Sequence, residues 1–256
     1  MTIVNMKTLF PTIGLFLILA SNAWAGGLHL RFERTYVDGE ATKTPDWSGN
    51  GNHGTLVNAP TLVAGRTGRG MGFNGTSQRI DLGVGTVTGD LSGAAGITMS
   101  AWVYQTALSS DTKSVIGIPI NETQTGGHLS VTALGDISVS GRSSWTDEGQ
   151  GEIAENIVTA GVWIHLVGVL DFVAKTITIY ADGQEVAAKS SVAFGATSYT
   201  LGTDDTDARI GMTPFINAAR YFNGTIDEPI ITPFAWTAEE VRAYYHSGEI
   251  PSRRAE

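Results

Sequence analysis

The loop at residues 46–52, DWSGNGN, has the residue types and spacing of a cation site. Oxygen-bearing side chains alternate along it at Asp46, Ser48, Asn50 and Asn52, and the glycines between them permit a tight wrap. Carboxylate, hydroxyl and amide oxygens are the ligands that calcium prefers. The loop begins like an EF-hand, but Val57 stands where that motif requires a bidentate glutamate. We therefore predict a calcium-binding loop that is not an EF-hand. The alternative is an Asx-turn loop without a metal, together with a buried Asp227 that holds backbone amides.

Two tryptophans in polar surroundings suggest a second kind of chemistry. An exposed indole offers a flat apolar face to a sugar ring, while polar neighbours bind the sugar hydroxyls. Trp47 and Trp145 lie in polar stretches, whereas Trp102 and Trp163 lie in apolar stretches and are expected in the core. We predict Trp47 and Trp145 as ligand-binding platforms.

Acids with the spacing of a glycosidase are missing from the predicted strands. A retaining glycosidase needs two carboxyl groups about 5 Å apart, which acids at i and i+2 or i+4 on one strand can provide. Glu148, Glu152 and Glu155 come nearest to this spacing, but they lie among glycines and are expected in a loop. Asp227 and Glu228 are adjacent, so a regular strand would turn them to opposite faces. We predict no catalytic residues and keep a polysaccharide-cleaving enzyme as a minor alternative.

The elements that must position these side chains are organised around residues 163–186, WIHLVGVLDFVAKTITIYADGQEV. The first eight residues are nearly all apolar, which predicts a strand buried on both faces and places His165 in the core or at its rim. After Lys175 apolar and polar residues alternate, which predicts a strand with one buried face. Asp182 and Gly183 are typical of a tight hairpin turn. The stretch therefore predicts three antiparallel strands in a meander.

Short alternating runs fill most of the remaining chain. They cover residues 28–33, 70–74, 78–82, 97–104, 114–118, 128–134 and 136–140. No helical stretch of about ten residues or more separates any two of them, which favours an all-β sandwich over an alternating α/β fold. One helix is expected at the end of the chain, because Thr237 and Glu240 form a capping box and Gly248 is a helix stop. Val241, Tyr244 and Tyr245 lie on its predicted buried stripe.

The order of these features resembles the laminin-G-like, concanavalin A-like lectin and glucanase superfamily. The resemblance is carried by DWSGNGNHGTL, GMGFNGTSQRIDLG, ITMSAWVY, WIHLVGVLDFVAKTITIYADGQEV, ARIG and FNGTIDEPIITPFAWTAEEVRAYY, and it runs over nearly all of residues 26–256. It implies a single domain at 26–256, a jelly-roll sandwich of two antiparallel sheets with a short C-terminal helix. It also implies carbohydrate binding, cell adhesion, or an accessory role in secreted polysaccharide enzymes.

The resemblance adds one acid to the predicted metal site. In laminin-G-like jelly rolls the second carboxylate comes from the last strand, which is Asp227 in GTIDE here. The implied calcium ligands are thus Asp46, Asn50, Asn52 and Asp227. The related glucanases carry E-x-D-x-x-E on one strand, and this sequence has no such motif. The resemblance is weakest over residues 106–160, and the stretch 145–156 is expected to be a variable loop that carries specificity.

The first 25 residues have the features of a secretory signal peptide. Lys7 precedes an apolar run, and Ala23-Trp24-Ala25 is a small-x-small cleavage signal. We therefore predict a signal peptide at residues 1–25 and secretion, either out of the cell or into the periplasm. The apolar run is shorter than the roughly 18 residues of a membrane span, so no membrane insertion is expected after cleavage.

Composition narrows the choice of partners. The chain has 256 residues, no cysteine and a formal net charge of −9. An exported domain without disulfides depends on its core, with possible help from a metal. The acidic balance argues against nucleic acid as a partner. We interpret the chain as a secreted, non-catalytic, lectin-like module that binds a carbohydrate or a cell-surface glycoconjugate and is stabilised by calcium. The alternative is an adhesive or structural envelope protein that binds another protein or itself.

Overall fold

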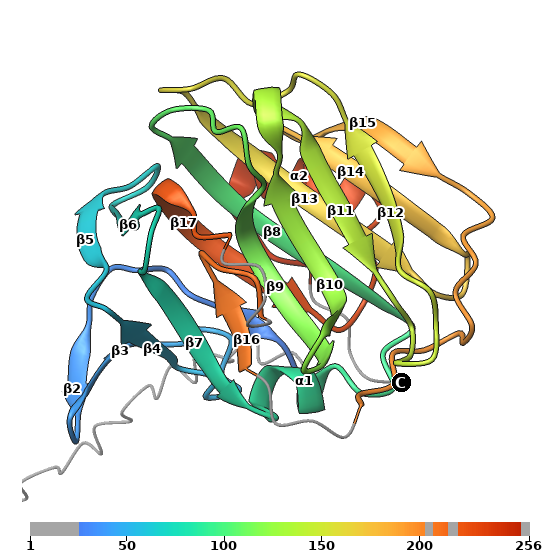
Figure 1. Ribbon diagram of the computed structural model, residues 1–256, viewed down its shortest axis with the longest axis horizontal. Helices are drawn as coiled ribbons and strands as arrows, with labels where there is room; N and C mark the ends of the chain where they lie inside the picture. The colour runs from blue at the N-terminus through green and yellow to red at the C-terminus, as the bar shows by residue number, and fades with distance from the viewer. Residues whose placement is uncertain (1–25, 203–206, 215–219, 252–256) are drawn as a thin grey trace, which may run out of the picture.

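The structure, a computed structural model, describes residues 26–202, 207–214 and 220–251. Two antiparallel sheets stack face to face in it (Figure 1), which confirms the predicted all-β jelly-roll sandwich. The predicted signal peptide at residues 1–25 lies outside the described residues. Within the described ranges, no helix has the length and apolar character needed to cross a membrane.

One sheet has eight strands and the other has nine. The eight-stranded sheet follows the order β15, β14, β13, β8, β17, β6, β5, with β1 also paired to β17. Its strands are β1 (Leu28–His29), β5 (Thr61–Ala64), β6 (Arg69–Asn74), β8 (Gly96–Gln105), β13 (Trp163–Asp171), β14 (Thr176–Ala181), β15 (Gln184–Lys189) and β17 (Asn223–Thr232).

The nine-stranded sheet follows the order β12, β11, β10, β9, β16, β7, β4, β3, β2. Its strands are β2 (Tyr36–Asp38), β3 (Ala41–Thr44), β4 (Gly54–Val57), β7 (Arg79–Val84), β9 (Lys113–Asn121), β10 (Gln124–Val131), β11 (Ile137–Gly141), β12 (Gln150–Ala154) and β16 (Asp207–Ile210). Two α-helices, α1 (Thr86–Asp90) and α2 (Ala238–Ser247), complete the regular structure together with a short 3-10 turn at Ala133–Gly135.

The predicted meander is the centre of the eight-stranded sheet. Strand β13 pairs with β14 and with β8, and β14 pairs with β15, all antiparallel. Asp182 and Gly183 have φ values of 46° and 77°, as the tight turn between β14 and β15 requires. Side chains from both sheets, such as Leu166 and Leu170 of β13 and Val139 of β11, fill the core between them.

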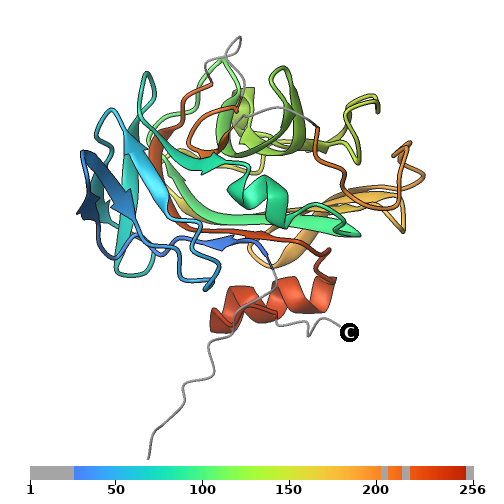
Figure 2. The same ribbon diagram turned by 90° about the horizontal axis from the view of Figure 1, so that it is seen from below.

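Helix α2 covers the outer side of the eight-stranded sheet. Thr237 and Glu240 make both hydrogen bonds of the predicted capping box, and Gly248 ends the helix with a φ of 70°. Val241 and Tyr244 are buried in a small apolar cluster with outward-facing residues of β13 and β17. Figure 2 shows the helix on the side of this sheet that faces away from the nine-stranded sheet. The two outer faces of the sandwich therefore differ, because one of them carries a helix.

The structure corrects several predicted boundaries. The strand predicted at 28–33 is reduced to β1, because Phe32 has a φ of 55°, which is outside the extended region. Strands β2, β3 and β5 are too short to show a period in the sequence. Strand β12 forms inside the stretch predicted as a loop, and Glu152 pairs there with Val139 of β11.

Candidate functional site

The Asp46 carboxylate holds the loop at 46–52 together. Its Oδ1 accepts hydrogen bonds from the backbone N–H groups of His29 (3.0 Å) and Ser48 (2.9 Å). Its Oδ2 accepts from the Ser48 hydroxyl (2.7 Å) and the Asn52 backbone N–H (3.0 Å). A carboxylate has about four lone-pair sites, so β1 and the loop occupy all of them. This is the geometry of the Asx-turn alternative, in which the acid organises its own loop.

Beside this carboxylate, polar groups converge on the carbonyl oxygen of Gly27. Asn52 Nδ2 donates to Gly27 O (2.7 Å) and to Asp90 Oδ2 (2.8 Å), and Asn50 Nδ2 donates to Gly27 O (3.3 Å). Asn52 is only 5% exposed. Asp90 is not among the ligands predicted from the sequence, because 38 residues separate it from Asn52.

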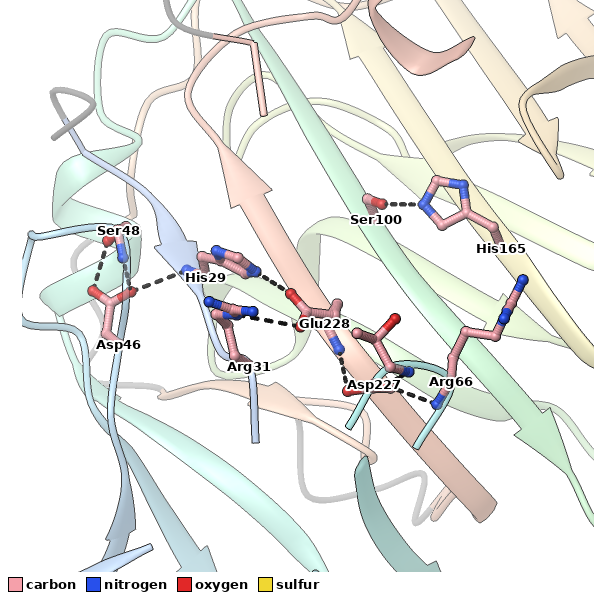
Figure 3. A network of polar contacts seen from close by, with 10 residues as sticks. His29, Arg31, Asp46, Ser48, Arg66, Ser100, His165, Asp227 and Glu228 are labelled. Carbon is pink, nitrogen blue, oxygen red and sulfur yellow. Dashed lines mark hydrogen bonds and ion pairs between the residues drawn. The ribbon is translucent and has the colours of Figure 1, made fainter. Parts of the chain in front are cut away.

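Asp227 lies in β17, on the opposite side of Glu228 from Asp46 (Figure 3). Its Oδ2 accepts hydrogen bonds from the backbone N–H groups of Arg66 (2.9 Å) and Thr67 (3.1 Å), and its Oδ1 accepts from that of Glu228 (2.9 Å). The side chain is fully buried, and this burial raises the pKa of Asp227 to about 7, although the Thr67 amide lowers it. Asp227 therefore anchors the turn after β5 and shares no hydrogen-bond donor with Asp46.

A β-bulge interrupts β17 at Glu228. The register of β17 against β8 shifts between Asp227 and Ile230, and Glu228 has a φ of 47°. The sequence predicts Asp227 and Glu228 on opposite faces, because side chains alternate along a regular strand. The bulge interrupts this alternation at Glu228. Glu228 Oε2 contacts His29 Nε2, and Glu228 Oε1 accepts from Arg31 Nε at 3.4 Å.

Glu228 lines a cavity of about 460 Å³ that also contacts Arg31, Arg66 and Trp102. The guanidinium of Arg66 lies 4.6 Å from the centre of the Trp102 ring. Arg31 and Arg34 lie over the ring of Trp47, at 5.6 and 5.8 Å from its centre. Trp47 is 48% exposed, but its indole already contacts two cations.

The structure brings Asp46, Asn50 and Asn52 into one loop and places Asp227 apart from them. Among the described residues, no group of three or more His, Cys, Asp or Glu side chains is arranged to hold a metal ion. Asp46 and Asp227 each accept backbone amides, so the two carboxylates do not fit one shared ion. The side-chain Nδ2 of Asn52 instead joins the Gly27 carbonyl oxygen to the Asp90 carboxylate. Calcium binding stays a prediction.

His165 is a core residue, one of the two positions that the sequence allows. Its Nε2 lies 2.8 Å from Ser100 Oγ, and both residues are fully buried. Burial among the rings of Trp102 and Tyr244 lowers the pKa of His165 to about 3, so the imidazole is neutral at pH 7. A serine beside a histidine is a nucleophile arrangement in principle. This pair is sealed beneath α2, where a substrate cannot reach it.

The loop that carries Trp145, between β11 and β12, is built around Asp147. Asp147 Oδ2 accepts from the backbone N–H groups of Ser143 (3.0 Å), Ser144 (3.1 Å) and Gly195 (3.0 Å) and from the Ser143 hydroxyl. Its Oδ1 accepts from the Ser144 hydroxyl at 2.8 Å. Burial opposes ionisation, but the hydrogen bonds from Ser143 and Ser144 outweigh it and lower the pKa of Asp147. The loop is therefore fixed before any ligand arrives.

Arg142 ties this loop to β10. Its Nε donates to the Asp147 carbonyl (3.1 Å), and its Nη1 donates to the Thr125 carbonyl (3.1 Å). Trp145 stands at the tip of the loop and is 55% exposed. No described residue makes a ring or cation contact with its indole. Trp145 thus keeps its apolar face available, in contrast to Trp47.

A groove of about 330 Å³ lies beside the Trp145 loop. Arg142 and Gly149 of the loop form part of its wall. Polar side chains from the ends of three strands supply most of the rest: Gln124 and Thr125 of β10, Ser140 of β11, and Gln150 of β12. The lining thus offers amide, hydroxyl and guanidinium groups, and the loop that forms part of its wall also carries the exposed indole of Trp145. These are the two components that hold a sugar, namely hydrogen-bonding groups and a flat apolar surface.

Sequence reasoning missed the residues that support both loops. Asp147 closes the Trp145 loop onto Gly195, which is 48 residues away, and nothing local indicates that contact. Its local signal was present, since Ser143 and Ser144 before an acid are typical of a side-chain-stabilised turn. The groove residues Gln124 and Gln150 gave no signal, because they converge only when β10, β11 and β12 pair.

The two stacked antiparallel sheets place this protein in the class of jelly-roll sandwiches, and a family model identifies the superfamily. The model of the concanavalin A-like lectin/glucanases superfamily, of the laminin G type, matches residues 74–242. The chain therefore belongs to this superfamily, as its motifs predict. A search of curated proteins gave no significant match.

Solved structures with the same fold include several binding domains. Domain 4 of AbnA, an extracellular arabinanase of Geobacillus stearothermophilus in complex with arabinotriose, is 20% identical with a TM-score of 0.59, and the match covers 87% of this chain and 100% of that one. The CBM40 domain of the Ruminococcus gnavus IT-sialidase bound to α2,3-sialyllactose is 18% identical with a TM-score of 0.56, covering 69% and 95%. A structure of botulinum neurotoxin type C, a toxin whose cell entry depends on interaction with two ganglioside molecules, is 10% identical with a TM-score of 0.63. The match covers 88% of this chain and 51% of that one. At these identities the likeness establishes the fold.

Proposed function

We propose that this protein is a secreted, non-catalytic carbohydrate-binding module whose ligand lies in the groove beside Trp145. The observation that carries the proposal is the rigid loop around Asp147, which exposes the indole of Trp145 and contributes Arg142 and Gly149 to the wall of a groove lined by polar side chains. A preformed platform loses little conformational entropy when a ligand binds. This geometry suits a ring with one apolar face and several hydroxyl groups.

The structural neighbours support the same class of ligand. The arabinanase domain is bound to arabinotriose and the CBM40 domain to sialyllactose, so this fold holds glycans in at least two other proteins. Arg142 is the one cation of the groove, and the nearby carboxylate of Asp147 offsets its charge while two of its N–H groups donate to backbone carbonyls. We therefore expect a neutral glycan rather than an acidic one, with arabinotriose as the first small probe.

For calcium, we propose a ligand set that differs from the predicted one. The residues that would hold an ion are Gly27 through its carbonyl, Asn52 through its amide, and Asp90 through its carboxylate. Their support is that Asn52 Nδ2 lies 2.7 Å from the Gly27 carbonyl oxygen and 2.8 Å from Asp90 Oδ2, so that the amide oxygen of Asn52 would face the same two oxygens if the amide turned over to bind an ion. A bound ion would tie the residue before β1 to the loop and to the last residue of α1. Its role would be stability rather than ligand contact.

Native electrophoresis in gels that contain single polysaccharides tests the function. The panel contains arabinan, xylan, a β-glucan and a sialylated mucin, and the same gels are assayed for released sugar. Retardation without released sugar is the expected result. Released sugar would favour the enzyme alternative. Normal migration in every gel would contradict glycan binding and favour the alternative of a protein partner.

A further inference from the structure

A cavity of about 430 Å³ on the outer side of the eight-stranded sheet has no part in the groove beside Trp145. It lies between β14 and residues 234–237, the segment that leads into α2. Its floor includes Thr176, Thr178 and Tyr180, which alternate along β14 and therefore point to the same face. Three hydroxyl groups thus stand in a row at the spacing of every second residue of a strand.

These hydroxyl groups are available for a ligand. None of Thr176, Thr178 and Tyr180 donates a side-chain hydrogen bond to any described residue. The two threonines are partly exposed, and Tyr180 is 5% exposed. Burial raises the pKa of Tyr180, so its hydroxyl stays protonated at neutral pH and remains a donor.

The opposite wall of the cavity is aromatic and fixed. Phe234 and Trp236 both line it, and the Thr98 hydroxyl clamps the segment between them, donating to the Phe234 carbonyl (2.8 Å) and accepting from the Trp236 backbone N–H (2.9 Å). Trp236 is 3% exposed, and its indole Nε1 is buried without an acceptor among the described residues. The segment is thus held in place by hydrogen bonds to its backbone, and the indole of Trp236 forms a fixed apolar part of the wall.

Charge limits what this cavity can hold. No lysine or arginine lines it, and its one carboxylate belongs to Asp171. Asp171 Oδ1 already accepts from the backbone N–H groups of Val173 (3.0 Å) and Ala174 (2.7 Å). The cavity therefore has no cation to attract an acidic group, and it suits an uncharged ligand with several hydroxyl groups and an apolar side.

We propose that the cavity over Thr176, Thr178 and Trp236 is a second glycan site, specific for neutral sugars. The hydroxyl row would bind sugar oxygens, and Phe234 and the edge of Trp236 that lines the cavity would contact the apolar side of the ring. This proposal rests on the proposed glycan-binding function and extends it, because the second site lies on the opposite sheet from the Trp145 groove. One molecule can then bridge two glycan chains, and binding to a polymer gains strength from both sites.

The indole N–H signals of the purified protein in a proton–nitrogen correlation spectrum report on the two sites separately. The chain has six tryptophans, and replacing Trp145 or Trp236 by phenylalanine assigns its signal. The probes are arabinotriose, xylotriose and maltotriose, each titrated alone. We expect one of them to shift the Trp145 and Trp236 signals with two different saturation curves, and the Trp145→Phe variant to retain the Trp236 curve.

A paired substitution connects the second curve to the hydroxyl row. Thr176→Val with Thr178→Val keeps the shape and strand preference of both residues and removes two hydroxyl groups. We expect this variant to bind about tenfold more weakly at Trp236, with the Trp145 curve unchanged. Thr61→Val, which removes an exposed hydroxyl from β5 of the same sheet, is the matched control and should leave both curves unchanged.

The outcomes separate the two proposals. A shift of Trp145 without a shift of Trp236 would overturn the second site and leave the first. A shift of Trp236 alone would support the second site and contradict the Trp145 groove. Absence of any shift at both signals with all three probes would contradict both proposals for neutral sugars. Equal affinity at Trp236 in the parent and the double variant would show that the hydroxyl row is not a binding surface.

Discussion

Two loops of this protein have the same plan and different surroundings. Each is organised by one aspartate, Asp46 or Asp147, whose oxygens accept at least four hydrogen bonds from nearby donors. Each presents a tryptophan that is about half exposed, 48% for Trp47 and 55% for Trp145. The loop at 46–52 is joined to β1, and the ring of Trp47 lies under two arginines. The ring of Trp145 contacts no other ring or cation among the described residues, and its loop forms part of the wall of a polar groove.

The difference shows that exposure alone does not define a sugar platform. In both loops an aspartate accepts hydrogen bonds from backbone N–H groups, but the role of the loop depends on the residues beside it. At residues 46–52 it joins an edge of the fold, and the neighbouring cations occupy the indole. At residues 142–149 it makes a rigid support for an indole with a free face. Both loops should therefore matter for stability, and only the second should matter for ligand binding.

The largest expected effect is a loss of folding stability at low pH, which comes from two buried histidines outside both loops. Burial lowers the pKa of His128 to about 4 and that of His165 to about 3, below the ordinary value of 6.5. Below pH 6.5 the unfolded chain binds protons that the folded chain does not, so stability falls as the pH drops through this window. We expect a loss on the order of 3 kcal/mol per histidine by pH 4. Chemical unfolding at several pH values measures it, and an unchanged slope in His165→Gln would contradict the assignment. The loops are therefore best compared above pH 7.

Removal of the organising acid is the next test. Asp46→Ala leaves four donors without their acceptor, and three of these belong to the buried residues Ser48 and Asn52. We expect a loss of about 3 kcal/mol, or roughly 6–12 °C in Tm, with glycan affinity unchanged. Asp147→Ala should cost about 2 kcal/mol and also weaken glycan binding, because the loop loses its fixed shape. Calorimetry and gel retardation on both variants measure the two effects. Equal effects on affinity would contradict the division of roles.

Removal of the indoles compares the two loops directly. Trp145→Ala should weaken binding by about 30-fold, equivalent to about 2 kcal/mol, because the platform is lost. Trp47→Ala is the matched control, since it removes an indole of similar exposure, and its affinity should equal that of the parent. Mobility as a function of polysaccharide concentration in the gel gives both dissociation constants. A larger loss for Trp47→Ala would reverse the assignment.

Calcium gives the smallest expected effect and concerns the 46–52 loop alone. Extracellular modules bind calcium at roughly 10⁻⁴ to 10⁻³ M, so about 5 mM calcium should add about 1–2 kcal/mol relative to a chelator. We expect Asp90→Asn to abolish this difference in Tm. Asp38→Asn, which removes an exposed acid paired only with Lys43, should preserve it. A parent Tm that does not respond to calcium would exclude the ion, and a full response in Asp90→Asn would exclude Asp90 as a ligand.

The sequence predicted the parts of this molecule that local patterns determine. The apolar run from Trp163, the turn at Asp182 and Gly183, and the capping box of Thr237 and Glu240 each follow from neighbouring residues, and the structure confirms all three. The polar surroundings of Trp145 also indicated an exposed residue, which it is.

The remaining features depend on contacts between distant residues. Asn52 meets Asp90 and Asp147 meets Gly195 only after the strands between them have paired. The bulge at Glu228 is invisible to a period of two, because a period assumes a regular strand. The contacts of Arg31 and Arg34 with the Trp47 ring also could not be predicted, because nothing in the loop sequence DWSGNGN indicates them.

A crystal structure of the protein with arabinotriose, or with an oligosaccharide from whichever polysaccharide retards it, tests the central claim most directly. We predict a sugar ring lying on the indole of Trp145, with its hydroxyl groups hydrogen-bonded to side chains of the groove such as Gln124 and Gln150. A sugar bound at Trp47, or one bound with the Trp145 groove empty, would contradict the account.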